Sequence, residues 1–141
     1  MNKIILQFSA LGLFLATSAL QDNNLEASKI RGEKLYTGLC QGCHKPDGSG
    51  YTKNKLSPPL AGSDYLLKNK ENGIQAVLFG LKGKVIVNDV EYDRAMPPVK
   101  WTDQELSDVL NYVRNTWGNK ASFISPEEIA EAREKKQETD K

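Results

Sequence analysis

Cys40-Gln41-Gly42-Cys43-His44 holds both cysteines and the only histidine of the 141-residue chain. Residues 29–43, which lead into this stretch and include both cysteines, carry apolar or small side chains at spacings of three and four. The repeating positions are Gly32, Tyr36, Leu39 and Cys43. This period is that of an α-helix with one buried face, so the sequence predicts a helix that runs directly into the cysteine pair.

Three kinds of site fit a Cys-x-x-Cys pair: a disulfide or redox pair, a metal site, and a covalent haem attachment site. A thioredoxin-like redox pair is expected near a βαβ pattern, which this sequence does not show. A structural zinc site usually takes four ligands, whereas Cys40, Cys43 and His44 are all the cysteine and histidine in the chain. Cys-x-x-Cys-His is the signature of c-type haem attachment. The sequence therefore predicts one haem c, bonded through both thiols with His44 on the iron, and keeps the other two sites as alternatives.

Met96 is the candidate for the second iron ligand. It lies in Ala95-Met96-Pro97-Pro98, where the prolines exclude a helix, rather than on an apolar stripe. With Met1 lost in processing, it would be the only methionine of the mature chain. A second histidine is absent, which excludes a bis-histidine haem within this chain. We predict that His44 and Met96 are the two iron ligands; the alternative is that Met96 fills a gap in the core.

The rest of the pattern is mainly helical. Residues 45–60 lack periodicity and predict a loop. Short helices are expected around 64–68 and from Asn72, which would be the N-cap, onward. Residues 85–92 resemble a tight hairpin, although neither central turn residue is glycine. Thr102 and Glu105 fit a capping box that begins a helix ending near Gly118. The predicted fold class is all-α with one short hairpin before the methionine loop.

The two ends of the chain differ from this domain. Residues 1–19 have a basic start, an apolar run and small residues, which predicts a secretory signal peptide and an exported, periplasmic protein. An uncleaved membrane anchor is the alternative, although the run is shorter than a spanning helix needs. Residues 20–28 are expected to be a flexible lead-in, and 119–141 a C-terminal tail with a possible short helix. We expect no membrane span in the mature chain.

Composition limits the function classes further. The formal net charge is +1, and charged residues make up 26% of the chain. A general nucleic-acid binder would show a basic excess or a basic stripe, so nucleic acid is not an expected partner.

Residues 29–118 resemble the class I cytochrome c family. The helix with Gly32 and Tyr36 before the motif is similar to the first helix of the family, and residues 110–113 resemble its C-terminal helix. The resemblance implies that these two helices cross, with Gly32 allowing close approach. It also implies that Pro58, in Ser57-Pro58-Pro59-Leu60, accepts a hydrogen bond from His44 through its carbonyl, while loop stiffening by the prolines is the alternative. The stretch from the hairpin to Gly118 is similar to cytochrome domains that serve periplasmic dehydrogenases and copper nitrite reductases.

The resemblance and the motif together predict one-electron transfer, not enzymatic catalysis. The partners would be redox proteins, such as a dehydrogenase, a reductase or an oxidase, with the chain either a monomer or a subunit of a complex. The alternatives are a haem enzyme or gas-binding protein with an open sixth iron position, and a subunit in which haem serves folding only.

Overall fold

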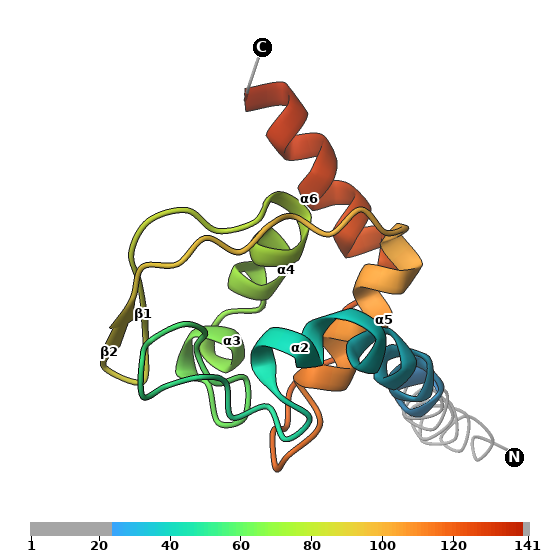
Figure 1. Ribbon diagram of the computed structural model, residues 1–141. Coiled ribbons are helices and arrows are strands. Elements are labelled where there is room, and N and C mark those ends of the chain that lie inside the picture. The colour runs from blue at the N-terminus through green and yellow to red at the C-terminus, as the bar shows by residue number, and fades with distance from the viewer. Residues whose placement is uncertain (1–23, 140–141) are drawn as a thin grey trace, which may run out of the picture.

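The computed structural model describes residues 24–139. Within that part of the chain helices dominate, and the sheet is a two-stranded hairpin (Figure 1). Residues 24–35 are α-helical, and the elements that follow are η1 (Tyr36–Cys40), α2 (Gln41–His44), α3 (Asp64–Lys68), α4 (Lys70–Phe79), β1 (Val85–Val87), β2 (Val90–Tyr92), α5 (Asp103–Val113) and α6 (Pro126–Thr139). The same residues include no helix with the length and apolar character needed to cross a bilayer. The predicted all-α architecture with one hairpin agrees with this arrangement.

The N-terminal helix is continuous from residue 24 to His44, with the π-helical turn η1 between two α-helical parts. The expectation of a flexible lead-in over 20–28 is therefore wrong for residues 24–28. Ser28 is 1% exposed, and its hydroxyl donates a hydrogen bond of 2.6 Å to Asp108 on α5. This buried contact stabilises the early helical turns. The signal peptide expected over 1–19, and residues 20–23, lie outside the described residues.

The N-terminal helix crosses α5, and both lie on the side of the molecule remote from the hairpin (Figure 1). The backbones approach closely at Gly32, where a Cβ atom would lie 2.0 Å from the carbonyl oxygen of Asp108. Beside the crossing, the ring of Tyr36 lies 5.4 Å from that of Tyr112 and 5.1 Å from that of Trp117. The crossing expected at Gly32 is present, and three aromatic rings stabilise it.

The hairpin has the register Val85↔Tyr92 and Val87↔Val90. Its two turn residues, Asn88 and Asp89, have φ of 51° and 62°. Positive φ at both positions is typical of the type I′ turn, and Asn and Asp tolerate it better than other non-glycine residues. The predicted two-residue turn is confirmed.

Two helix starts show how side-chain caps determine the boundaries. The capping box of Thr102 and Glu105 begins α5, as predicted. Helix α4 begins at Lys70, because the side chain of Asn69 accepts a hydrogen bond from the amide of Glu71. The N-cap expected at Asn72 is therefore wrong by three residues.

The C-terminal segment belongs to the core. Ile124 and Ile129 are both 0% exposed, and they pack with residues of α4 and α5. The buried side chain of Asn111 donates to the carbonyl of Ile124 at 2.9 Å and accepts from its amide at 2.8 Å. The tail expected over 119–141 thus contains a 14-residue helix, α6, which is fixed to α5.

Candidate functional site

The Cys-x-x-Cys-His stretch lies at the end of the N-terminal helix, in η1 and α2. Both cysteines are free; Cys40 is half-buried and Cys43 is exposed. Burial, together with the nearby Cys43, raises the pKa of Cys40 to about 11. The helix ends at His44 because Lys45 turns to a φ of 62°. The two thiols and the imidazole are thus presented on one short, helical segment.

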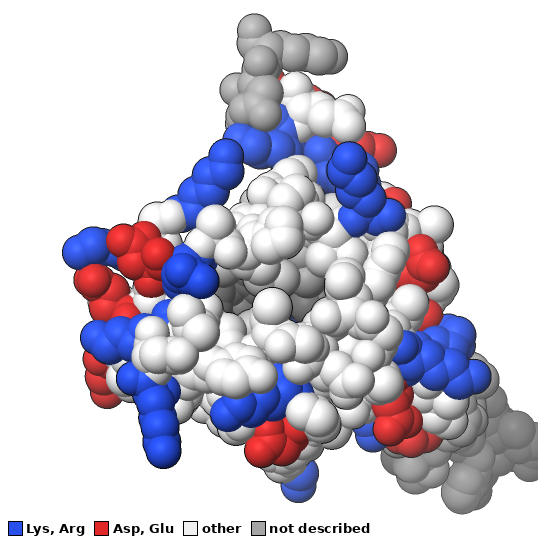
Figure 2. Space-filling view, viewed as in Figure 1, with Lys and Arg blue, Asp and Glu red and all other residues white. Residues whose placement is uncertain are grey.

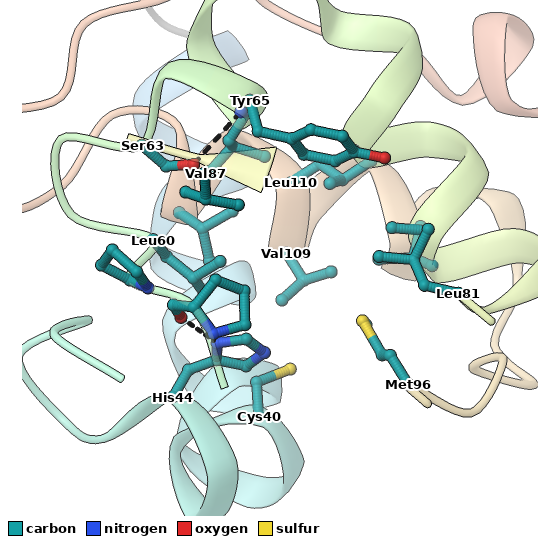
Figure 3. Close-up of a pocket in the computed structure, with 17 residues that line it drawn as sticks. Cys40, His44, Leu60, Ser63, Tyr65, Leu81, Val87, Met96, Val109 and Leu110 are labelled. Carbon is teal, nitrogen blue, oxygen red and sulfur yellow. Dashed lines mark hydrogen bonds between the residues drawn. The ribbon is translucent and has the colours of Figure 1, made fainter. Parts of the chain in front are cut away.

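A cavity lies between this segment, α3, α4 and α5 (Figure 3). The space between its walls is about 630 Å³, counting the part open to solvent. Most of its wall is apolar and includes Leu60, Leu66, Val77, Leu81, Val87, Val109, Leu110 and Val113. Figure 2 shows a hollow on the same face, bordered by uncharged residues with lysines and arginines farther out. The cavity therefore suits a largely apolar cofactor that stays partly open to solvent.

His44 lines this cavity and is 9% exposed. Its Nδ1 lies 3.1 Å from the carbonyl oxygen of Pro58, which is the contact that the family resemblance implied. Because a carbonyl only accepts, Nδ1 carries the proton and Nε2, which points into the cavity in Figure 3, is the free lone pair. Burial lowers the pKa of His44, and the bond to Pro58 partly opposes this. A neutral imidazole is the form that binds metals.

Ser57 adds a second connection between the same two segments. Its hydroxyl, in a residue only 6% exposed, donates to the carbonyl of Cys43 at 2.5 Å. It also accepts from the amide of Tyr51 at 3.1 Å. Two neighbouring residues, Ser57 and Pro58, thus form hydrogen bonds with two neighbouring residues, Cys43 and His44, respectively. The sequence interpretation missed Ser57, and its position directly before Pro58 was the available signal.

Met96 faces the cavity from the wall opposite His44, with its sulfur toward the cavity (Figure 3). Its backbone forms an isolated antiparallel bridge with Leu81, through hydrogen bonds of 2.9 and 3.0 Å. Gly80 supports this position, because its φ is +74° and a Cβ there would lie 2.4 Å from the Met96 carbonyl oxygen. A loop without helix or strand therefore still holds its side chain at a defined place.

This donor set fits a haem better than it fits the alternatives. An imidazole nitrogen and a thioether face one apolar cavity, and a thiol lies at its edge. Across residues 24–139, no group of three or more His, Cys, Asp and Glu side chains comes together to hold a metal ion. The zinc alternative thus has no ligand set in the described part of the chain.

The family model for cytochrome c matches residues 30–117. The chain belongs to the cytochrome c family. Membership implies a covalently bound haem c and a role in electron transfer, not that of an enzyme. The match ends just before the segment that leads to α6, so it leaves the C-terminal helix unassigned.

Three curated relatives are cytochrome subunits of dehydrogenases. The cytochrome c subunit of a quinone alcohol dehydrogenase from Gluconobacter oxydans is 33% identical over 107 residues, which are 72% of this chain and 22% of the relative. The gluconate 2-dehydrogenase cytochrome c subunit of Pantoea cypripedii is 32% identical over 112 residues, 72% of this chain and 24% of the relative. The fructose dehydrogenase cytochrome subunit of Gluconobacter japonicus is 25% identical over 119 residues, 80% of this chain and 24% of the relative. The chain thus spans about a quarter or less of each relative.

Proposed function

We propose that the chain transfers single electrons through one haem c, bonded to Cys40 and Cys43, with His44 and Met96 as iron ligands. The observation that carries this proposal is the placement of the His44 imidazole and the Met96 sulfur on opposite walls of one apolar cavity. The haem would supply an iron that gains and loses one electron reversibly. The residues around the haem would determine its redox potential.

Each of these residues has a separate part. Met96 would contribute a neutral, soft ligand, which favours the reduced iron and raises the potential. Pro58 would hold the imidazole in one orientation through the 3.1 Å bond to Nδ1. The apolar wall would exclude water, and with His44 and Met96 both bound to it, the iron would be little accessible to other molecules. This combination suits electron exchange rather than substrate chemistry.

The partners follow from the relatives. Because the similar proteins are cytochrome subunits of quinone alcohol, gluconate and fructose dehydrogenases, we infer that the electron comes from a reduced dehydrogenase and passes to a second redox protein. The basic and apolar start of the sequence supports an exported, periplasmic location for this exchange.

The first experiment is production of the full chain with a c-type maturation system. A pyridine haemochrome spectrum and the mass of the purified protein should show one haem bonded through two thioethers, with residues 1–19 removed. A protein without covalent haem would disprove the proposal.

The second experiment tests the ligand pair. The oxidised protein should show the weak near-infrared band of sulfur-to-iron ligation, and Met96→Ala should remove it. Leu81→Ala is the matched control, since it removes a neighbouring cavity side chain and keeps the thioether. An unchanged band in Met96→Ala, or rapid binding of carbon monoxide by the reduced wild-type protein, would show that Met96 is not the ligand.

A further inference from the structure

Gly50 contacts both partners of the hydrogen bond that orients His44. Its amide donates to the carbonyl of His44 at 3.1 Å. A Cβ atom on Gly50 would lie 2.5 Å from the carbonyl oxygen of Pro58, which is the oxygen that accepts from His44 Nδ1 (dashed line beside His44 in Figure 3). Gly50 is buried, and its φ of +65° is a value that favours glycine. Space and backbone conformation therefore both disfavour a side chain at this position.

Residues 46–50 are held in place by contacts from other parts of the chain. The indole Nε1 of Trp117, at the end of α5, donates to the carbonyl of Pro46 at 3.2 Å. The ring of Trp117 also covers Gly48, where a Cβ would lie 2.6 Å from it. The carbonyl of Gly48 accepts from the amide of Leu60 at 2.8 Å. These contacts oppose any movement of the segment away from its neighbours.

A side chain at position 50 would consequently act on the bond between His44 and Pro58. A carbon atom cannot remain 2.5 Å from the Pro58 oxygen, so this oxygen and the backbone of residue 50 must separate. Because residue 50 is also bonded to the carbonyl of His44, either displacement changes the position of the Pro58 oxygen relative to Nδ1. The absence of a side chain at Gly50 thus permits the 3.1 Å contact.

We propose that Gly50 is a positioning residue for the iron ligand His44, an inference that rests on the covalent haem of the proposed function. Gly50 lets the Pro58 carbonyl reach Nδ1, and Trp117 holds the segment that carries Gly50. The hydrogen bond at Nδ1 makes the imidazole a more basic ligand. A more basic ligand favours the oxidised iron, so Gly50 keeps the potential lower than it would be without this bond.

The test compares Gly50→Ala with Gly62→Ala in the haem-loaded protein. Both changes place an alanine at nearly the same φ, +65° and +63°, but a Cβ at Gly62 meets nothing within 4 Å. Gly50→Ala should raise the midpoint potential at fixed pH and shift the NMR resonance of the His44 ring Nδ1–H in the reduced protein. The near-infrared band of the methionine ligand should be unchanged. Gly62→Ala should leave the potential, the resonance and the band as in the wild type, although it may be less stable because of its backbone strain.

A second variant keeps the inference open to disproof if Gly50→Ala does not fold. Trp117→Phe retains an aromatic ring and removes the indole N–H that binds the Pro46 carbonyl. It should shift the potential and the Nδ1–H resonance in the same direction as Gly50→Ala, by a smaller amount.

Three results would overturn the inference. They are a wild-type potential and resonance in Gly50→Ala, or in Trp117→Phe where that variant replaces it, equal shifts in Gly50→Ala and Gly62→Ala, and loss of the near-infrared band in Gly50→Ala. The last would show that the change disturbs the whole site rather than the orientation of His44. Absence of covalent haem from the wild type would instead disprove the proposed function.

Discussion

Gly32 lies so close to α5 that a Cβ atom on it would come within 2.0 Å of the carbonyl oxygen of Asp108 and 2.8 Å of the Cβ of Tyr112. Neither neighbour is a flexible side-chain end, so any larger residue must separate the two helices. This close approach explains why a glycine, which is unfavourable inside a helix, occurs in the middle of the N-terminal helix.

Gly32→Ala should therefore lower the free energy of unfolding by about 3 kcal/mol, because it overpacks the crossing. Gly38→Ala is the matched control, since a Cβ at Gly38 meets nothing within 4 Å. That change should be neutral or stabilise by up to about 1 kcal/mol. Denaturant titration of both haem-loaded variants measures the difference, and equal effects would contradict the close approach.

Removal of the Ser57 hydroxyl should loosen the segment that orients His44. Pro58 binds His44 through its backbone carbonyl, which no substitution removes. The segment is therefore tested at Ser57, whose side chain makes the neighbouring contact. Ser57→Ala should cost about 1–3 kcal/mol, because it leaves the Cys43 carbonyl without this donor. It should also speed hydrogen exchange at the His44 ring Nδ1–H, measured by NMR. Ser122→Ala, at an exposed serine, should change neither quantity; exchange that is as slow in Ser57→Ala as in the wild type would refute the role.

Arg31 and Lys29 lie on the same helix but make ion pairs of different kinds. Arg31 binds both oxygens of Asp108, at 2.7 and 2.8 Å, and the Asp108 side chain is only 3% exposed. Lys29 pairs with Glu26, which is 65% exposed. Arg31→Met should thus cost about 2 kcal/mol, because it leaves the buried Asp108 carboxylate with only neutral hydrogen-bond partners, Ser28 and Gln104, among the described residues. Lys29→Met should cost less than about 1 kcal/mol. Thermal or chemical unfolding compares them, and equal losses would argue against the buried pair.

Helix α6 should contribute to stability although the family match ends before it. Ile129 is 0% exposed, so Ile129→Ala should cost about 2–4 kcal/mol through the cavity it leaves. Glu134→Ala on the exposed face of the same helix should have little effect. A small, equal loss in both variants, measured by denaturant titration, would show that α6 does not pack on the core in solution.

The chain without haem should be largely unfolded. Several residues belong at once to the core and to the cavity wall, among them Leu66, Val109, Leu110 and Val113. Without the cofactor the core therefore encloses a cavity that its side chains cannot fill. The double variant Cys40→Ala/Cys43→Ala, which prevents attachment, should lose most of its helical circular dichroism. A spectrum like that of the haem-loaded protein would refute this expectation.

The features that were predicted best are those formed by neighbours in the sequence. The cap of α5 joins Thr102 to Glu105, and the hairpin turn needs only Asn88 and Asp89. The local pattern led to the wrong N-cap for α4, because two asparagines lie three residues apart and Asn69, not Asn72, caps the helix. The side chain of Asn72 instead donates to the carbonyl of Tyr65 at 2.8 Å, a contact that requires α3 to be in place.

The sequence alone was enough to predict the chemistry of the Cys-x-x-Cys-His motif, because Cys40, Cys43 and His44 are near neighbours and their spacing on a helical turn is local. It also identified Met96 and Pro58 as candidates. The contact of the Pro58 carbonyl with His44, the bridge of Met96 to Leu81 and the bond from Ser57 to Cys43 could be recognised only once the fold was known. These contacts join segments far apart in the chain. They depend on how the helices pack around one cavity, which local residue patterns do not encode.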